Sequence, residues 1–220
     1  MNPDSSSNQP SAQPSFVKDV FQRGLIRGGE NLPFDPVKRY FYVEHPTEGW
    51  RVYLRACCFI HEKGPNPLDK SRFLVVKRTG AAANEKAWEP PKGQMEAKDG
   101  LRDPHESIGQ LLRQNVKREV AEEARVKNLQ GLRHTGIIFQ GREKDYPPNH
   151  FFQYHIFSAL VTPAEWQRAT EELDWYREHP AAFARLRRDK KEKDAIDWYQ
   201  PSQHKLMGKW SPKIVAMYLS

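Results

Sequence analysis

The sequence predicts an α+β protein, arranged as an α/β/α sandwich, from the order of its segments and from its composition. Strand-like segments come first, a long helical stretch follows, and further strands and helices complete the chain, an order typical of this class. The chain has 220 residues, 38% of them hydrophobic, which is enough to build one good core. We therefore expect a single domain over residues 16–220 with a helical C-terminal part.

Five segments have the apolar and β-branched composition of strands. They cover residues 39–44, 51–61, 72–77, 132–139 and 150–161.

Cys57 and Cys58 are adjacent within the second strand segment. Successive side chains of a strand point to opposite faces, so the two thiols cannot easily form a disulfide. We expect two buried thiols. The absence of a disulfide framework favours an intracellular compartment, the cytoplasm first, with the nucleus as the alternative.

Helical patterns lie between and after the strands. Apolar residues recur at helical spacing from Ile108 to Val116, and Asp103-Pro104 suits a helix N-terminus. Thr162-Pro-Ala-Glu165 has the pattern of a capping box that opens a second long helix. Residues 180–193 are expected to form another helix, and Ser211-Pro212 to start a last short one.

Composition limits the partners of the chain. Residues 1–15 are rich in Ser, Asn, Gln and Pro without the basic start or apolar centre of a signal peptide, so we expect a disordered tail. No apolar stretch approaches the eighteen or so residues that span a bilayer, so no membrane partner is expected. A formal charge of +7 suits an anionic partner. The basic residues of 185–193 alternate with acids, which favours a solvated helix face and leaves RNA a secondary possibility.

Three glutamates lie at helical spacing in Arg118-Glu119-Val-Ala-Glu122-Glu123. Positions i, i+3 and i+4 share one face of a helix, where like charges repel unless a cation neutralises them. Oxygen ligands without cysteine or histidine suit Mg²⁺ or Mn²⁺ rather than zinc. The pattern indicates a divalent-metal site, and its alternative is a solvated helix whose glutamates pair with neighbouring basic residues.

A second cluster lies upstream, in Trp88-Glu-Pro-Pro-Lys92-Gly93-Gln-Met-Glu96. A turn of this kind before a helix offers backbone groups and one ammonium group to a phosphate. By itself, Trp88 is equally well explained as a core residue, and Lys92 as a surface lysine. Together with the glutamates they favour phosphate chemistry.

Residues 93–126 resemble the Nudix box, G-x5-E-x7-R-E-U-x-E-E-x-G-U, where U is a bulky apolar residue. Gly93 matches the leading glycine, and Asp99 stands where the first glutamate belongs. The second half of the box is matched at Arg118, Glu119, Val120, Glu122, Glu123 and Val126. The resemblance implies a Nudix fold with a mixed sheet and a long catalytic helix, and a hydrolase that acts on phosphoric anhydrides.

Two departures from the box stand out. Eighteen residues separate Asp99 from Arg118 where the family has seven, so the catalytic helix is expected to begin about three turns early. Arg125 replaces the glycine that normally supplies the left-handed conformation at the helix end, so we expect this helix to end by a different device. Neither departure removes a metal-ligand position.

The resemblance also implies roles for the matched residues. Glu119, Glu122 and Glu123 would bind Mg²⁺ or Mn²⁺, and the Gly93 carbonyl would add a ligand. Arg118 would hold a carboxylate in place. Arg118 and Glu119 are therefore counted with Glu122 as the catalytic set.

Hydrolysis also requires a general base that removes a proton from the attacking water, and side chains that bind the substrate. Glu122 is the first candidate for the general base, with Glu143 and Asp145 as alternatives from the loop before the last predicted strand. Lys92 is expected to contact a substrate phosphate. Tyr146 is a candidate for stacking a nucleobase, because stacking requires little more than a flat aromatic face.

The segment Trp-x-Pro-Pro-Lys-Gly-x-x-Glu is similar to that of Nudix enzymes acting on dinucleoside polyphosphates. It is less similar to those of mRNA-decapping and diphosphoinositol polyphosphate enzymes. We therefore expect a Mg²⁺-dependent pyrophosphohydrolase of a small anionic nucleoside polyphosphate. The alternative of another class is a catalytically inactive Nudix-like binding module in a ribonucleoprotein assembly, which would have no reason to keep three metal-binding glutamates.

Overall fold

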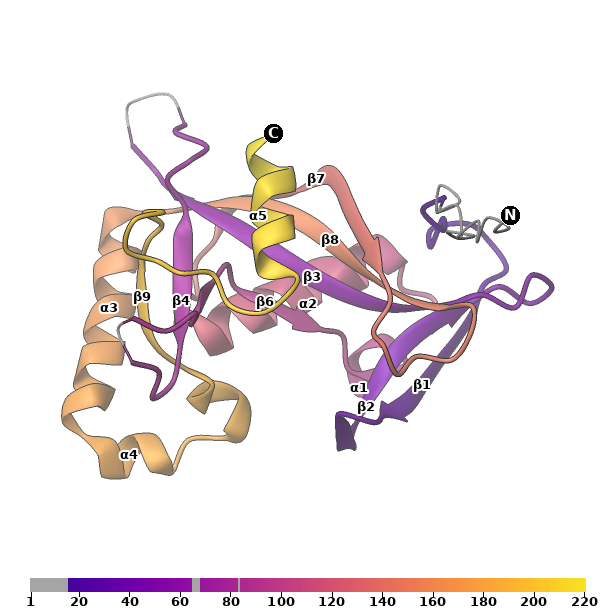
Figure 1. Ribbon diagram of the computed structural model, residues 1–220, viewed down its shortest axis with the longest axis horizontal. Coiled ribbons are helices and arrows are strands. Elements are labelled where there is room, and N and C mark those ends of the chain that lie inside the picture. Colours follow the sequence, from indigo (N-terminus) through magenta and orange to yellow (C-terminus); the bar gives the residue numbers. More distant parts are fainter. Residues whose placement is uncertain (1–15, 65–67, 83) are drawn as a thin grey trace, which may run out of the picture.

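The computed structural model describes residues 16–64, 68–82 and 84–220, built around two β-sheets (Figure 1). The tail expected for residues 1–15 lies outside the described residues. The larger sheet has the order β1-β2-β3-β8-β7, and a short strand, β6, also pairs with β3. Its strands are β1 (Ile26–Leu32), β2 (Asp35–Glu44), β3 (Arg51–Glu62), β6 (Lys92–Gln94), β7 (Gln130–Gly141) and β8 (His150–Val161). β3 and β8 run parallel and the other pairs antiparallel, so the expected mixed sheet is confirmed.

A smaller antiparallel sheet has the order β5-β4-β9. Its strands are β5 (Trp88–Glu89), β4 (Leu74–Arg78) and β9 (Lys193–Trp198). All five strands predicted from the sequence are present, within a few residues of their predicted bounds. The additional strands β1, β5, β6 and β9 were not predicted, because they are short or rich in charged and glycine residues.

The prediction of a helix over residues 180–193 is wrong beyond the first turn. The structure has a short helix, α4 (Pro180–Ala184), then a 3₁₀ turn, η1 (Arg188–Lys191), before β9 begins. Tertiary contacts override the local helical pattern here. Thr79 donates from its amide to the Glu192 carbonyl and from its hydroxyl to the Lys191 carbonyl, and the chain then pairs with β4.

The long helix α2 (Ile108–Glu123) packs on one face of the larger sheet. Leu112, Val116 and Val120 repeat every four residues and are fully buried. The helix starts ten residues before Arg118, about three turns early as expected. Its N-cap is Ser107, whose hydroxyl accepts from the Gln110 amide, rather than the predicted Asp103-Pro104.

The remaining helices complete the layers. α3 (Pro163–Glu178) begins at the predicted Thr162, whose hydroxyl accepts from the Glu165 amide. α5 (Ser211–Leu219) begins at the predicted Ser211-Pro212 and covers the opposite face of the larger sheet from α2, where Tyr218 stacks on Phe59 with ring centroids 3.7 Å apart. A separate one-turn helix, α1 (Ala97–Gly100), precedes α2. Helices therefore lie on both faces of the sheet.

The two cysteines are free and fully buried on β3, as predicted. Cys58 belongs to the core under α2, and Cys57 to the core under α5. Among the described residues, no helix is both long and apolar enough to cross a membrane.

Candidate active site

A cavity of about 520 Å³ opens between α2, β6 and the β1–β2 hairpin. Its lining carries eight acidic and five basic side chains, a formal excess of three negative charges. The acids are Glu96, Glu119, Glu122, Glu123, Glu143, Asp145, Asp189 and Glu192, and the bases are Lys38, Arg55, Lys92, Arg118 and Lys144. Such a lining favours binding of a cation. A polyanion can bind beside it when it brings a cation of its own.

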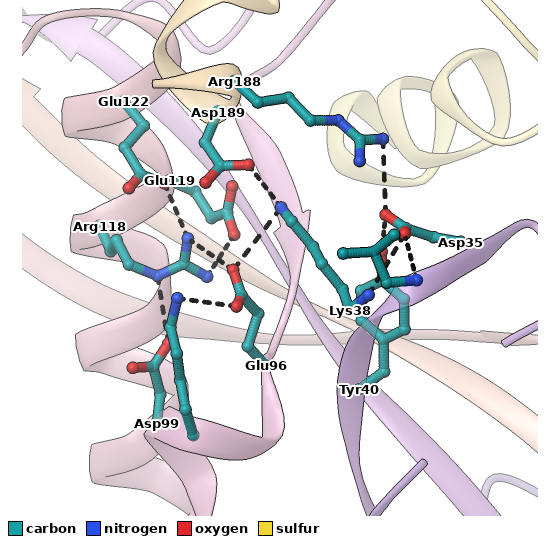
Figure 2. Close-up of polar contacts among 12 residues, drawn as sticks. Asp35, Lys38, Tyr40, Glu96, Asp99, Arg118, Glu119, Glu122, Arg188 and Asp189 are labelled. Atoms are coloured by element: carbon teal, nitrogen blue, oxygen red, sulfur yellow. Dashed lines mark hydrogen bonds and ion pairs between the residues drawn. The ribbon is translucent and has the colours of Figure 1, made fainter. Parts of the chain in front are cut away.

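The guanidinium of Arg118 lies among four carboxylates, which we call the Arg118 network (Figure 2). It donates to Glu119 Oε1 and Glu122 Oε2, each at 2.7 Å. Its Nε lies 3.4 Å from Asp99, and its Nη1 lies 3.8 Å from Glu96. Asp99 reaches Arg118 despite the insertion, because α1 places it beside the middle of α2.

Gly93 and Glu119 are in close contact at the edge of this network. A Cβ at position 93 would lie only 1.9 Å from the Glu119 carboxyl carbon, so a side chain there would displace the carboxylate. Burial raises the pKa of Glu119 to about 8; Arg118 opposes this shift, and the neighbouring Glu123 and Glu122 add to it. This carboxylate therefore lies where an additional cation would be favourable.

Glu123 turns away from the Arg118 network into a buried group of charges, which we call the Lys193 cluster. Lys193 Nζ lies 2.5 Å from Glu89 Oε1 and 3.2 Å from Glu123 Oε1. The Lys92 ammonium lies 2.8 Å from Glu89 Oε2, and the Lys92 amide donates to Glu123 Oε2 at 2.9 Å. Ser211 also donates to Glu89. Both carboxylate oxygens of Glu123 are thus engaged by the protein itself.

The loop between β7 and β8 supplies another wall. Glu143 and Asp145, the alternative general bases, both line the cavity. Glu143 accepts from Arg55 Nη1 and from Trp210 Nε1, each at 3.1 Å. Tyr146 is buried behind this wall, where its hydroxyl accepts from Arg55 Nη2 at 3.1 Å, and its base-stacking role stays a prediction.

Other aromatic side chains do line the cavity. They are Phe34, Tyr40 and Tyr154. Phe34 is 58% exposed, and its ring centroid lies 5.5 Å from that of Tyr40.

Ion pairs link η1 to β2 beside the cavity, at what we call its mouth. Lys38 on β2 lies 2.5 Å from Asp189 on η1 and 3.6 Å from Glu96 (Figure 2). Arg188 on η1 lies 3.5 Å from Asp35, at the start of β2.

Sequence reasoning missed several residues around the cavity, above all Glu89, Lys193, Lys38, Asp189 and Arg55. Glu89 and Glu96 lie inside the Trp88–Glu96 segment, and their charge next to Lys92 could have indicated a place at the site. Lys193, Lys38 and Asp189 are remote in sequence from the box and carried no local signal.

The donor set fits a hard divalent cation, because it offers carboxylate and carbonyl oxygens only. In this conformation the Arg118 guanidinium stands between Glu119 and Glu122. Over the described ranges, no three acidic, histidine or cysteine side chains converge on one point. The contact between Gly93 and Glu119 is the observation that supports the fit, since only a residue without a side chain lets that carboxylate lie against the β6 backbone.

The expectation that α2 ends by a different backbone device is wrong, as Arg125 shows. Its φ is 60°, so it adopts the left-handed conformation that the family's glycine would supply. Its side chain is 2% exposed and donates to the carbonyls of Glu122 and Lys190. Arg125 thus uses the same backbone device, with hydrogen bonds that offset the strain.

We compared this chain with known protein families and solved structures. The family model of the NUDIX domain matches residues 56–214. The fold is similar to that of a NUDIX hydrolase from Nitrosomonas europaea, with 14% identity, a TM-score of 0.42, and 76% of this chain and 87% of that chain covered.

Two further solved structures are similar at the same level. One is the NUDIX domain of Shewanella oneidensis NrtR complexed with ADP ribose, with 13% identity, a TM-score of 0.43, and 78% and 89% coverage of this chain and that one. The other is an Ap4A hydrolase from C. elegans, with 16% identity, a TM-score of 0.40, and 76% and 94% coverage. Comparison with curated proteins gives no match. The match of the NUDIX model over most of the chain shows that this protein belongs to the Nudix family, with its α+β fold, and is a hydrolase acting on phosphoric anhydrides.

Proposed function

We propose that this chain is a Mg²⁺-dependent pyrophosphohydrolase of a nucleoside polyphosphate, with a dinucleoside polyphosphate as the first candidate. The observation that carries the proposal is the single cavity in which the acidic residues of α2 meet the cations Lys92 and Arg55. Hydrolysis of a phosphoric anhydride requires both, because charge must be neutralised on the bridging and terminal oxygens while a water is activated.

Glu119 and Glu122, with the Gly93 carbonyl, are the residues that would hold Mg²⁺ or Mn²⁺. The bound metal supplies a Lewis acid and lowers the pKa of a bound water. Arg118 keeps the two carboxylates together by donating to both. The sequence motif also assigns Glu123 to the metal ligands, and in the structure one oxygen of Glu123 contacts Lys193.

Glu122 is the proposed general base. Its side chain is 21% exposed, against 12% for Glu119 and 5% for Glu123, so it is the most open of the three to a water in the cavity. Glu143 is the alternative, but it is held by Arg55 and Trp210. A base must reach the water that it deprotonates, which supports Glu122.

Lys92 and Arg55 would bind the phosphates. The Arg55 guanidinium lies 4.2 Å from the centroid of Phe152 and 5.4 Å from that of Tyr154, and the Lys92 ammonium lies 5.9 Å from Tyr154. The two cations therefore flank one aromatic ring on the cavity wall. Buried charges of this kind bind phosphate oxygens strongly, because little water screens them.

The nucleotide class rests on the Trp-x-Pro-Pro-Lys-Gly-x-x-Glu segment and on the cavity. A volume of about 520 Å³ is within the range of small-molecule sites. Phe34, which lines the cavity and is 58% exposed, offers an aromatic face for a base. Capped RNA and diphosphoinositol polyphosphates are the rival substrates, and a binding module in a ribonucleoprotein assembly is the rival of another class.

A substrate panel tests the proposal. Dinucleoside polyphosphates, nucleoside triphosphates, nucleotide sugars, diphosphoinositols and capped RNA are incubated with the wild type, with and without Mg²⁺ or Mn²⁺. Glu122→Gln is the test variant, and Glu178→Gln, at an exposed position of α3, is the matched control. We expect metal-dependent cleavage of a dinucleoside polyphosphate that is lost in Glu122→Gln alone. No cleavage of any substrate would favour the binding module.

A further inference from the structure

The three glutamates of the α2 row do not share one environment. Glu119 and Glu122 contact Arg118, whereas Glu123, which also borders the cavity, contacts Lys193 and is 5% exposed. One oxygen of Glu123 contacts the Lys193 ammonium, and the other accepts from the Lys92 amide. Glu123 is therefore neutralised without any bound ion.

Lys193 is fixed in this place by the fold. It begins β9, where it pairs with Arg78 of β4, and its side chain is 5% exposed. Its two carboxylate partners, Glu89 and Glu123, are 4% and 5% exposed. A buried carboxylate without a partner is strongly unfavourable, so the ammonium cannot leave without a replacement cation.

A second cavity, whose lining does not include Arg118, adjoins the cluster. It has a volume of about 470 Å³, and its lining includes Lys193, Glu89 and Glu123. Space reachable by an ion thus exists beside these carboxylates. Loss of the ammonium would leave Glu89 and Glu123 with Lys92 as the remaining cation of the cluster, one negative charge in excess within the cluster itself. The rest of the lining carries Arg78, Lys191 and Glu192, so the lining as a whole would become neutral.

We propose that Lys193 is a built-in counter-cation for Glu123, standing where a further divalent ion would otherwise bind and so confining metal to Glu119, Glu122 and the Gly93 carbonyl. The inference rests on the proposed metal site of the catalytic cavity. It assigns the C-terminal part of the chain a role at that site. The number of ions bound is then set by β9, which lies outside the Nudix box of residues 93–126.

Metal binding without substrate tests this directly. Mn²⁺ binding is followed by the electron paramagnetic resonance signal of the free ion, in wild type, Glu119→Gln, Glu123→Gln and Lys193→Met. Lys193→Arg keeps the charge, and Lys190→Met, at an exposed position three residues away, is the matched control. Circular dichroism and the Tm establish that each variant is folded.

We expect Glu119→Gln to weaken Mn²⁺ binding about tenfold or more, the scale on which lost ligand contacts act, and Glu123→Gln to change it less than about twofold. Lys193→Met should bind one more Mn²⁺ than the wild type, while Lys193→Arg and Lys190→Met match the wild type.

Two results would overturn the inference. One is a folded Lys193→Met variant that binds the same number of Mn²⁺ ions as the wild type. The other is a Glu123→Gln variant whose Mn²⁺ affinity is as low as that of Glu119→Gln. If Lys193→Met does not fold, the Glu123→Gln result decides alone. A wild type that binds no Mn²⁺, or whose binding ignores Glu119→Gln, overturns the proposed metal site instead, so the two failures are distinguishable.

Discussion

Two charged groups flank the last turns of α2, and they differ in their access to solvent. Arg118 is 24% exposed and opens onto the cavity with Glu119 and Glu122. Lys193 and its partners Glu89 and Glu123 are at most 5% exposed. The difference teaches that one helix can present carboxylates to an exchangeable cation at one edge and to a permanent one at the other.

Helix geometry explains the division. Consecutive residues on a helix are rotated by about 100° from one another, so Glu122 and Glu123 cannot face the same partner equally. Glu122 follows Glu119 at i+3 toward the cavity, and Glu123 is the residue turned toward the smaller sheet. The predictions below test whether the two groups are as different as their exposure indicates.

The largest expected effect is on catalysis at the open group. Glu119→Gln and Glu122→Gln should each lower kcat about a hundredfold or more, because each removes a proposed metal ligand or base. Glu123→Gln should lower kcat less than about tenfold. Steady-state kinetics at saturating Mg²⁺ measure this ordering, and equal losses in all three variants would erase the distinction.

The next effect is on stability at the closed group. Lys193→Met should lower the free energy of unfolding by about 3–5 kcal/mol, because it leaves two buried carboxylates with one cation. Arg118→Met should cost less, since water reaches its partners. Urea denaturation at pH 7 in EDTA gives both values. A smaller loss for Lys193→Met than for Arg118→Met would reverse the comparison.

The two groups should respond to pH with opposite signs in metal-free protein. The pKa of Glu119 is raised from 4.5 to about 8, so its ionisation lowers stability as pH rises through that window. The pKa of Glu89 is lowered from 4.5 to about 2, opposed by burial and favoured by Lys92 and Lys193, so its contribution is present above pH 4.5 and lost as pH falls toward 2.

Unfolding of the corresponding glutamine variants in EDTA checks these signs. Glu119→Gln should gain stability relative to wild type between pH 5 and pH 8. The loss caused by Glu89→Gln should be largest near neutral pH and shrink below pH 4.5. Difference curves that run parallel for the two variants would show that the groups share one environment.

The smallest effect concerns the pair at the cavity mouth. Lys38 and Asp189 are 24% and 27% exposed and lie 2.5 Å apart. A double-mutant cycle of Lys38→Met and Asp189→Asn should give a coupling free energy below about 1 kcal/mol that declines with added salt. A coupling as large as that of the Lys193 cluster would mean that the mouth is as rigid as the interior.

The sequence predicted most of the layers and the Nudix family, because hydrophobic period, capping residues and the box are local signals. Ser211-Pro212 and Thr162 are clear cases, since a cap is defined by neighbours in the chain. Strand β9 of the smaller sheet escaped prediction because residues 188–198 take their structure from hydrogen bonds with Thr79 and β4. Lys193 escaped for the same reason, as its carboxylate partners lie 70 and 104 residues away.

Arg125 joins two elements through its backbone and its side chain. Its backbone does what a glycine would do, while its side chain ties the end of α2 to η1 through the Lys190 carbonyl. Arg125→Gly would relieve the backbone and at the same time remove that tie, leaving the carbonyls of Glu122 and Lys190 without this donor. The substitution therefore combines a favourable backbone effect with an unfavourable side-chain effect, and the join between α2 and η1 depends on which of the two is larger.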